Sequence, residues 1–166
     1  MTQPPGINWS RLLVYGLLPT LALLLAVAAG LLKWKDSSVR NTDLARSESV
    51  AAARDSTVAL LTFRFDTVDR DVAAARQRLT GKFRDVYTQR TQEELIPNAK
   101  EQRVSARAVV PGAASESATH NHAVVLVFVN QTIKIGDSAP ADAVSSVRVT
   151  LDKIGERWLV SDFDQF

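Results

Sequence analysis

HAVVLVFVNQ, residues 122–131, is the strongest predicted strand of this chain, because apolar and mostly β-branched side chains follow one another from Val124 to Val129. Such a run is typical of a strand in the centre of a sheet. We therefore expect a sheet built around this segment, with the other elements arranged to cover it.

Alternating apolar and polar residues predict further strands on both sides of this run. These strands lie at residues 104–110, 147–151 and 157–160. Pro111-Gly112 predicts a turn or a bulge after the first of them, and Gly155 a tight reversal before the last. Residues 136–142, rich in Gly, Asp, Ser and Pro, are expected to form a loop.

The part of the chain before the strands has a helical period. Helices are predicted at residues 42–66, 69–79 and 83–95. Thr80-Gly81 should end the second helix, and Pro97 should stop the third. Helices followed by an antiparallel meander predict an α+β fold, with the helices packed on one face of a curved antiparallel sheet of about four strands.

An apolar segment without Lys, Arg, Asp or Glu, Leu12–Leu32, precedes this domain. As an α-helix it would reach ~31 Å, which matches the hydrocarbon core of a bilayer. A buried core helix and a signal peptide cleaved after Ala26-Val27-Ala28 are the alternatives, but the apolar run continues past that site. We expect an uncleaved transmembrane helix at 12–32, a tail at 1–11, a connector at 33–44 and the α+β domain at 45–166.

The distribution of charge argues against nucleic acid as a partner. The chain has a formal net charge of +2 and no cysteine. Residues 1–35 carry Arg11, Lys33 and Lys35 without any acid, so the positive excess belongs to the flanks of the apolar segment, where it suits lipid headgroups. The absence of cysteine excludes disulfides, thiol catalysis and cysteine metal sites.

The same charges do not decide the orientation in the membrane. Lys33, Lys35, Arg40 and Arg46 follow the apolar segment, whereas only Arg11 and the amino terminus precede it. Taken literally, the positive-inside rule would put the domain in the cytoplasm. The excess is small, so charge alone leaves both orientations open.

Three segments carry a resemblance to a known family. They read FDTVDRDVAAARQRLTGKFRDVY (65–87), HAVVLVFVNQT (122–132) and VRVTLDKIGERWLVSDF (147–163). In this order, behind an apolar segment, they resemble the Mce-associated membrane proteins of actinobacteria over roughly residues 45–166.

The resemblance implies a cystatin-like, cone-shaped domain, like that of the nuclear-transport-factor-two-like superfamily and of a periplasmic scaffold subunit of type IV secretion systems. It also implies a single-pass protein of the cytoplasmic membrane whose domain is extracytoplasmic, on the periplasmic side. Phe83, Trp158 and Val160 would then belong to the structural core. Phe128 on the central strand is expected to join them.

The polar residues predict no catalytic, metal or cofactor site. His120 and His122 could share one face of a strand, but a third ligand is missing nearby, so we interpret them as exposed strand-end residues. Asp69 and Asp71 are typical of a helix N-terminus, and Glu93-Glu94 of a solvated helix face. The arginines of residues 70–90 alternate with acids and are interpreted as ordinary helix surface.

Two classes of function remain. The first is a non-enzymatic accessory or scaffold subunit of an Mce-type lipid or sterol import complex, with the bilayer and other membrane or envelope subunits as partners. The second is a cone whose cavity binds a lipid ligand or turns it over; a secretion-system scaffold is a further alternative. A cone filled by Trp158, Phe128 and Leu126 would favour the scaffold, and a polar cavity would favour the ligand.

Overall fold

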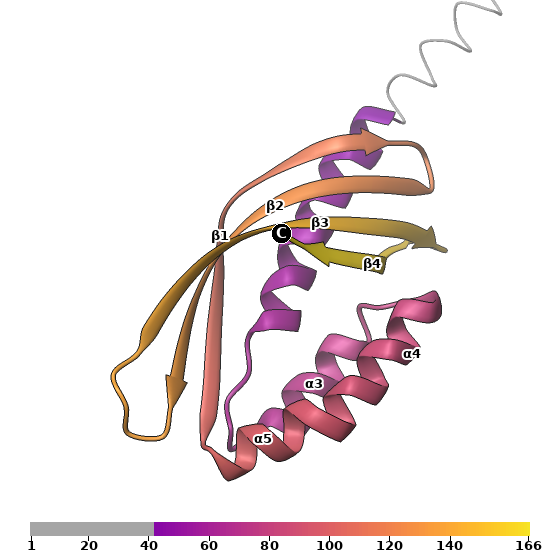
Figure 1. Ribbon diagram of the computed structural model, residues 1–166. Helices are drawn as coiled ribbons and strands as arrows, with labels where there is room; N and C mark the ends of the chain where they lie inside the picture. Colours follow the sequence, from indigo (N-terminus) through magenta and orange to yellow (C-terminus); the bar gives the residue numbers. More distant parts are fainter. Residues whose placement is uncertain (1–41) are drawn as a thin grey trace, which may run out of the picture. The chain divides into compact units, whose positions relative to one another are not determined.

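The computed structural model describes residues 42–166 (Figure 1). The predicted membrane helix Leu12–Leu32, the tail and most of the connector lie outside the described residues. Within residues 42–166, no helix combines the length and the apolar character needed to cross a bilayer.

Four antiparallel strands form a single sheet in the order β1-β2-β3-β4. They are β1 Val104–Ala118, β2 His122–Ile135, β3 Ala141–Ile154 and β4 Arg157–Gln165. Strands that are adjacent in the sheet are also consecutive in the sequence, and each is joined to the next by a short reversal. The predicted α+β fold with helices packed against a curved antiparallel sheet of about four strands is confirmed.

β1 continues through Pro111-Gly112, which is a bulge and not the end of the strand. The register with β2 shifts between Val109 and Gly112, and again between Ser115 and Ser117. Pro111 is tolerated because β1 is an edge strand, where a missing N–H breaks no ladder. Bulges increase the local bend of a strand, and Figure 1 shows the sheet curving strongly over the helices.

The helical layer begins with residues 42–61, a shorter helix than the predicted 42–66. It continues with α3 Val68–Arg76, α4 Gly81–Arg90, a π-helical turn Thr91–Leu95 and α5 Ile96–Glu101.

The prediction that Pro97 stops the third helix was wrong. Pro97 lies in the first turn of α5, directly after a π-helical turn. The preceding turn, Thr91–Leu95, has the wider i→i+5 pattern. One helical path therefore runs from Gly81 to Glu101 and passes through the proline.

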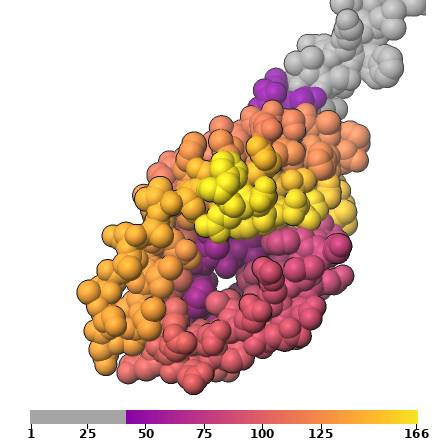
Figure 2. All heavy atoms as spheres, viewed as in Figure 1, coloured from indigo at the N-terminus to yellow at the C-terminus, as the bar shows by residue number. Residues whose placement is uncertain are grey.

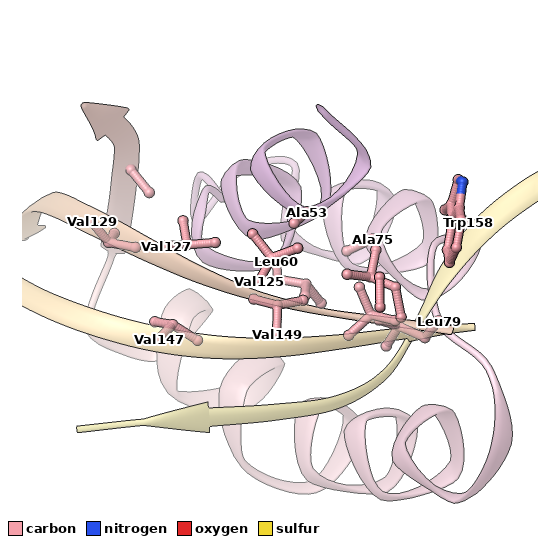
Figure 3. Packing of buried hydrophobic residues seen from close by; sticks show 14 of the residues in the cluster. Ala53, Leu60, Ala75, Leu79, Val125, Val127, Val129, Val147, Val149 and Trp158 are labelled. Atoms are coloured by element: carbon pink, nitrogen blue, oxygen red, sulfur yellow. The ribbon is translucent and has the colours of Figure 1, made fainter. Parts of the chain in front are cut away.

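The core lies between the helix of residues 42–61 and the inner face of the sheet (Figure 3). The sheet supplies fully buried side chains from three strands: Val125, Val127, Val129, Val147, Val149, Leu151 and Val160. The helix meets them with small buried residues, Ala45, Ser49, Ala53 and Ser56, followed by Leu60. Small side chains let the helix backbone approach the valine rows closely.

The residues expected in the core divide into two groups. Val160 is fully buried, Trp158 is 8% exposed, and Phe83 packs half-buried against the same cluster. The assignment of Phe128 was wrong, because its side chain is 46% exposed on the other face of the sheet. In β2 the odd-numbered residues point inward and the even-numbered ones outward, as the period of a strand requires.

Short backbone pairings attach the helices to both edges of the sheet. Phe63, just after the first helix, exchanges two hydrogen bonds of 2.9 Å with Ala106 on β1. On the other edge, the N–H of Thr80 donates to Val160 on β4, and the N–H of Val160 donates to Arg78, both at 2.9 Å. These pairings fix where α3 lies and cover part of each sheet edge.

We predict that Trp158→Ala lowers the free energy of unfolding of residues 42–166 by ~3–5 kcal/mol, the range for removing a buried aromatic side chain. The substitution leaves a cavity and removes the hydrogen bond that the indole Nε1 donates to Glu48 (3.1 Å). Urea denaturation followed by circular dichroism measures the change. Ile154→Ala, at a side chain that is 56% exposed, is the control and should change stability by less than about 1 kcal/mol. Equal effects of the two substitutions would contradict the packing of Trp158.

Candidate interaction site

An open groove of about 560 Å³ separates the helix of residues 42–61 from α3. Its lining is Asp55, Val58, Ala59, Thr62, Phe63, Arg64, Thr67, Arg70, Asp71, Ala74 and Arg78. The floor is apolar, and charged side chains surround it. A groove with an apolar floor and a few charged groups at its margin is suited to bind another molecule.

The spacing of the lining residues explains how the sequence builds this groove. Positions 55, 58, 59 and 62 recur at intervals of three and four residues, which puts them on one face of the first helix. Positions 67, 70, 71 and 74 do the same for α3. The buried positions of the first helix, such as Ala53, Ser56 and Leu60, lie on the neighbouring face against the sheet.

Some charges of the groove are already engaged within the domain. The Asp71 carboxylate accepts hydrogen bonds from the Thr67 hydroxyl (2.7 Å) and the Arg64 backbone N–H (3.2 Å). The Arg64 guanidinium is paired with Asp66 at 2.6 Å. These contacts hold the linking segment and the first turn of α3, so they serve the fold.

Other charges of the groove have no such partner. Within residues 42–166, no side-chain hydrogen bond or ion pair engages Arg70, Arg78 or Asp55. Two guanidinium groups and one carboxylate are therefore available to a partner at the margin of the apolar floor. Both arginines are exposed, which agrees with their interpretation as surface residues, and the acids close to them in sequence are engaged elsewhere in the structure.

A polar cluster anchors the first helix near its start. Glu48 accepts hydrogen bonds from Lys153 Nζ (2.9 Å) and Trp158 Nε1 (3.1 Å) through the same oxygen. The hydrogen bond from Lys153, then that from Trp158, holds the pKa of Glu48 below its ordinary value. The cluster ties the helix to the β3–β4 hairpin.

The two histidines are not brought together as metal ligands. His120 lies exposed in the β1–β2 turn, whereas His122 opens β2 and pairs through Nδ1 with Asp152 at 2.7 Å. Among the described residues, no group of three or more metal-ligating side chains occurs. Both imidazoles are exposed, as predicted.

The acidic pairs have the structural roles that their positions predicted. Asp69 and Asp71 lie in the first turn of α3, where Asp69 also forms an ion pair with Lys100 of α5 at 2.7 Å. Glu93 accepts a hydrogen bond from Gln89 on the exposed helix face. These carboxylates therefore stabilise the helical layer.

Tyr87, on the apolar face of the predicted third helix, joins the two parts of the core. Its ring packs against both hydrophobic clusters, the large one under the sheet and the small one around Val68, Val72 and Ala99. Burial raises the pKa of its hydroxyl to about 12. Tyr87 therefore stays neutral and connects α4 to the two parts of the core.

The family model described as "Uncharacterized protein Rv1363c/MT1408-like" matches residues 16–161. The chain belongs to this family. One relative, "Outer membrane protein Rv1973" of Mycobacterium tuberculosis, is 57% identical over 157 residues, which cover 95% of this chain and 98% of the relative.

Solved structures share the fold at low sequence identity. An IcmL-like type IV secretion system protein of Legionella pneumophila superposes with a TM-score of 0.63 and 12% identity, covering 73% of this chain and 91% of the other. The VirB8 protein of Agrobacterium tumefaciens gives 0.57 and 12%, covering 70% and 88%. The predicted likeness to type IV secretion scaffolds is confirmed for the fold.

We predict that Glu48→Gln makes the fold less sensitive to acid. The pKa of Glu48 is lowered from 4.5 in the folded protein. Its contacts therefore stabilise the fold above the unfolded pKa, and this contribution disappears as the pH falls through the lower folded pKa. The glutamine variant should lose thermal stability at neutral pH and show a shallower decline of Tm below about pH 5.

Differential scanning fluorimetry from about pH 7 to about pH 3 measures both effects. Glu156→Gln is the matched control, because Glu156 is exposed in the β3–β4 turn and has no partner among the described residues. A Glu48→Gln curve parallel to that of Glu156→Gln would contradict the role of the cluster.

Proposed function

We propose that the protein is a non-enzymatic, membrane-anchored scaffold subunit of the cell envelope that stabilises an Mce-type lipid or sterol import complex. The observation that carries this proposal is the open groove with an apolar floor and three unpaired charges, Arg70, Arg78 and Asp55. Such a surface suits a protein segment with one apolar face and charges of both signs.

The mixture of charges supports a protein partner in particular. An amphipathic helix could lay its apolar side on Val58, Ala59 and Ala74, and direct acidic residues to Arg70 and Arg78. A basic residue of the same segment would pair with Asp55. Opposite charges across an interface favour the correct partner and disfavour others.

The envelope location of the proposal has separate support. The relative Rv1973 is named as an outer membrane protein, and the structurally similar proteins belong to type IV secretion systems. We extend this to an extracytoplasmic domain, anchored in the cytoplasmic membrane by Leu12–Leu32. A scaffold of a secretion-type assembly would use the same fold and the same groove.

A second candidate function is the binding of a lipid or sterol-like ligand under the curved sheet. Figure 2 shows an opening between the strands and the helices, bordered by purple atoms of the first helix. A ligand there would lie beside the apolar core, whereas a partner of the scaffold would occupy the groove. Substitutions at the two places separate the functions.

We predict that alkaline phosphatase fused after Phe166 is active, because this enzyme folds only after export. A green fluorescent protein variant that folds only in the cytoplasm, fused at the same position, should stay dark. The reverse result would put the domain in the cytoplasm. A mature protein beginning at Ala29 would show that the apolar segment is a cleaved signal.

We predict that the double substitution Arg70→Glu/Arg78→Glu reduces the abundance of co-purifying envelope subunits and the uptake of lipid by the host cell, and leaves the Tm nearly unchanged. Both arginines are unpaired within the domain, so charge reversal acts on the partner and not on the fold. Arg84→Glu on α4 is the control, because Arg84 is also exposed and its side chain has no partner among the described residues.

Quantitative mass spectrometry after purification in mild detergent measures subunit abundance. If the co-purifying subunits were as abundant with the double variant as with the wild type, the groove would be excluded as their docking site. A variant such as Tyr87→Phe that abolishes uptake, with folding and subunit levels intact, would instead favour the ligand, because it changes one buried hydroxyl only.

A further inference from the structure

The outer face of the sheet, which is turned away from the helices (Figure 1), carries a cluster of exposed apolar side chains. Val109 is 48% exposed, Phe128 46%, Val144 79% and Phe166 64%. Large apolar side chains scattered singly on a surface need no explanation, but a contiguous group marks an interaction site.

The strand register places these four side chains at diagonally neighbouring positions of the outer face. Asn130 on β2 pairs with Val109 on β1 and with Val144 on β3. In the adjacent outward-facing row, Phe128 pairs with Ser146, whose backbone exchanges hydrogen bonds with Phe166 (2.9 and 3.2 Å). The four residues thus form a band from β1 to Phe166, directly after β4, ~14 Å wide at the usual strand spacing, with Asn130 and Ser146 between them. We call it the apolar stripe.

Neighbouring groups hold the two rings of the stripe in place. Phe128 lies over Gly112, where an added Cβ would be 3.5 Å from its ring. The guanidinium of Arg148 lies 5.6 Å from the centre of the Phe166 ring, and Glu116 holds it there at 3.1 Å. Rings held in this way lose little entropy on binding.

The outer face has opposite charges at two corners. At one corner, Arg107 lies on β1 and Lys134 on β2, both beyond the stripe. The nearby Asp142 is engaged in a hydrogen bond from Thr132. Asp162 and Asp164 lie at the diagonally opposite corner, on β4. None of these two basic and two acidic side chains has a partner among residues 42–166. Apolar side chains surround Asn130 and Ser146 in the middle of this face, one corner is positive and the opposite corner is negative.

We propose that a second copy of this chain covers the apolar stripe. The two-fold axis would lie in the plane between the two facing sheets, at right angles to the diagonal between the charged corners. It would bring the centre of the stripe of one copy onto that of the other. The same axis brings Arg107 and Lys134 of each copy towards Asp162 and Asp164 of the other. A face that complements itself under a two-fold axis is what a symmetric dimer requires.

The stripe lies in the sheet and the groove lies in the helical layer, so this dimer does not depend on the proposed function. Dimerisation through the outer face leaves Arg70, Arg78 and Asp55 accessible. The two proposals can therefore fail separately.

The chain has no cysteine, so one introduced thiol reports self-association in the full-length protein. We expect Asn130→Cys, at the centre of the stripe, to give several-fold more covalent dimer with a short bismaleimide in native membranes than Arg84→Cys on α4. A linker is needed because sheets packed face to face lie ~10 Å apart. Adding Val144→Asp to Asn130→Cys should reduce the dimer several-fold, and the Tm should remain that of the wild type because Val144 is exposed.

A second measurement tests the orientation of the two copies. Arg107→Cys and Asp164→Cys should each cross-link poorly alone but several-fold better when both variants are co-expressed. Equal cross-linking of Asn130→Cys and Arg84→Cys would overturn the proposal. Another protein, the lipid surface or the N-terminal part of the chain would then cover the stripe. Efficient cross-linking of Arg107→Cys with itself would overturn the two-fold arrangement.

Discussion

The close contact between the helix of residues 42–61 and the valine rows of the sheet is the constraint on which the rest of the domain depends. Ala45, Ser49 and Ala53 present almost no side-chain volume, so the helix lies directly on the inner face. The sheet curves around it, helped by the bulges of β1. Because this face of the helix is fully used by the sheet, the adjacent face with Asp55 and Val58 remains for α3 and forms one wall of the groove.

The backbone pairings at the two sheet edges complete this arrangement. The Phe63–Ala106 pairing holds the end of the first helix at β1, and the Thr80–Val160 pairing holds the end of α3 at β4. α3 is therefore fixed between two opposite edges of the sheet. The width of the groove is set by these backbone contacts, so changes of its surface charges can alter binding with little effect on the fold.

The sequence predicted the elements better than the faces they present. Alternation of Val147, Val149 and Leu151 with polar residues identified both a strand and its buried side. In residues 124–129 every side chain is apolar, so periodicity indicated a strand but could not tell Val127, which is buried, from Phe128, which is not. This ambiguity produced the error about Phe128 and concealed the apolar stripe.

Two other features could not be predicted for related reasons. The buried face of the first helix consists mainly of alanine and serine, which are also common on helix surfaces, so the sequence predicted the helix but not the face that the sheet covers. The availability of Arg70 and Arg78 depends on which carboxylates their neighbours engage. Asp71 is bound to Thr67 and Asp69 to Lys100, and such choices are made by tertiary contacts that lie outside any local pattern.

The apolar stripe and the groove would act together in the proposed membrane-anchored protein. Two copies anchored in one bilayer, as proposed, would meet at a high effective concentration, so even a small apolar contact would hold them together. A dimer formed in this way would present two grooves, and a partner with two matching segments would bind far more tightly than to one copy. Weak contacts on two separate surfaces of each chain would then suffice for a stable envelope assembly, because the membrane and the symmetry supply what the individual contact areas lack.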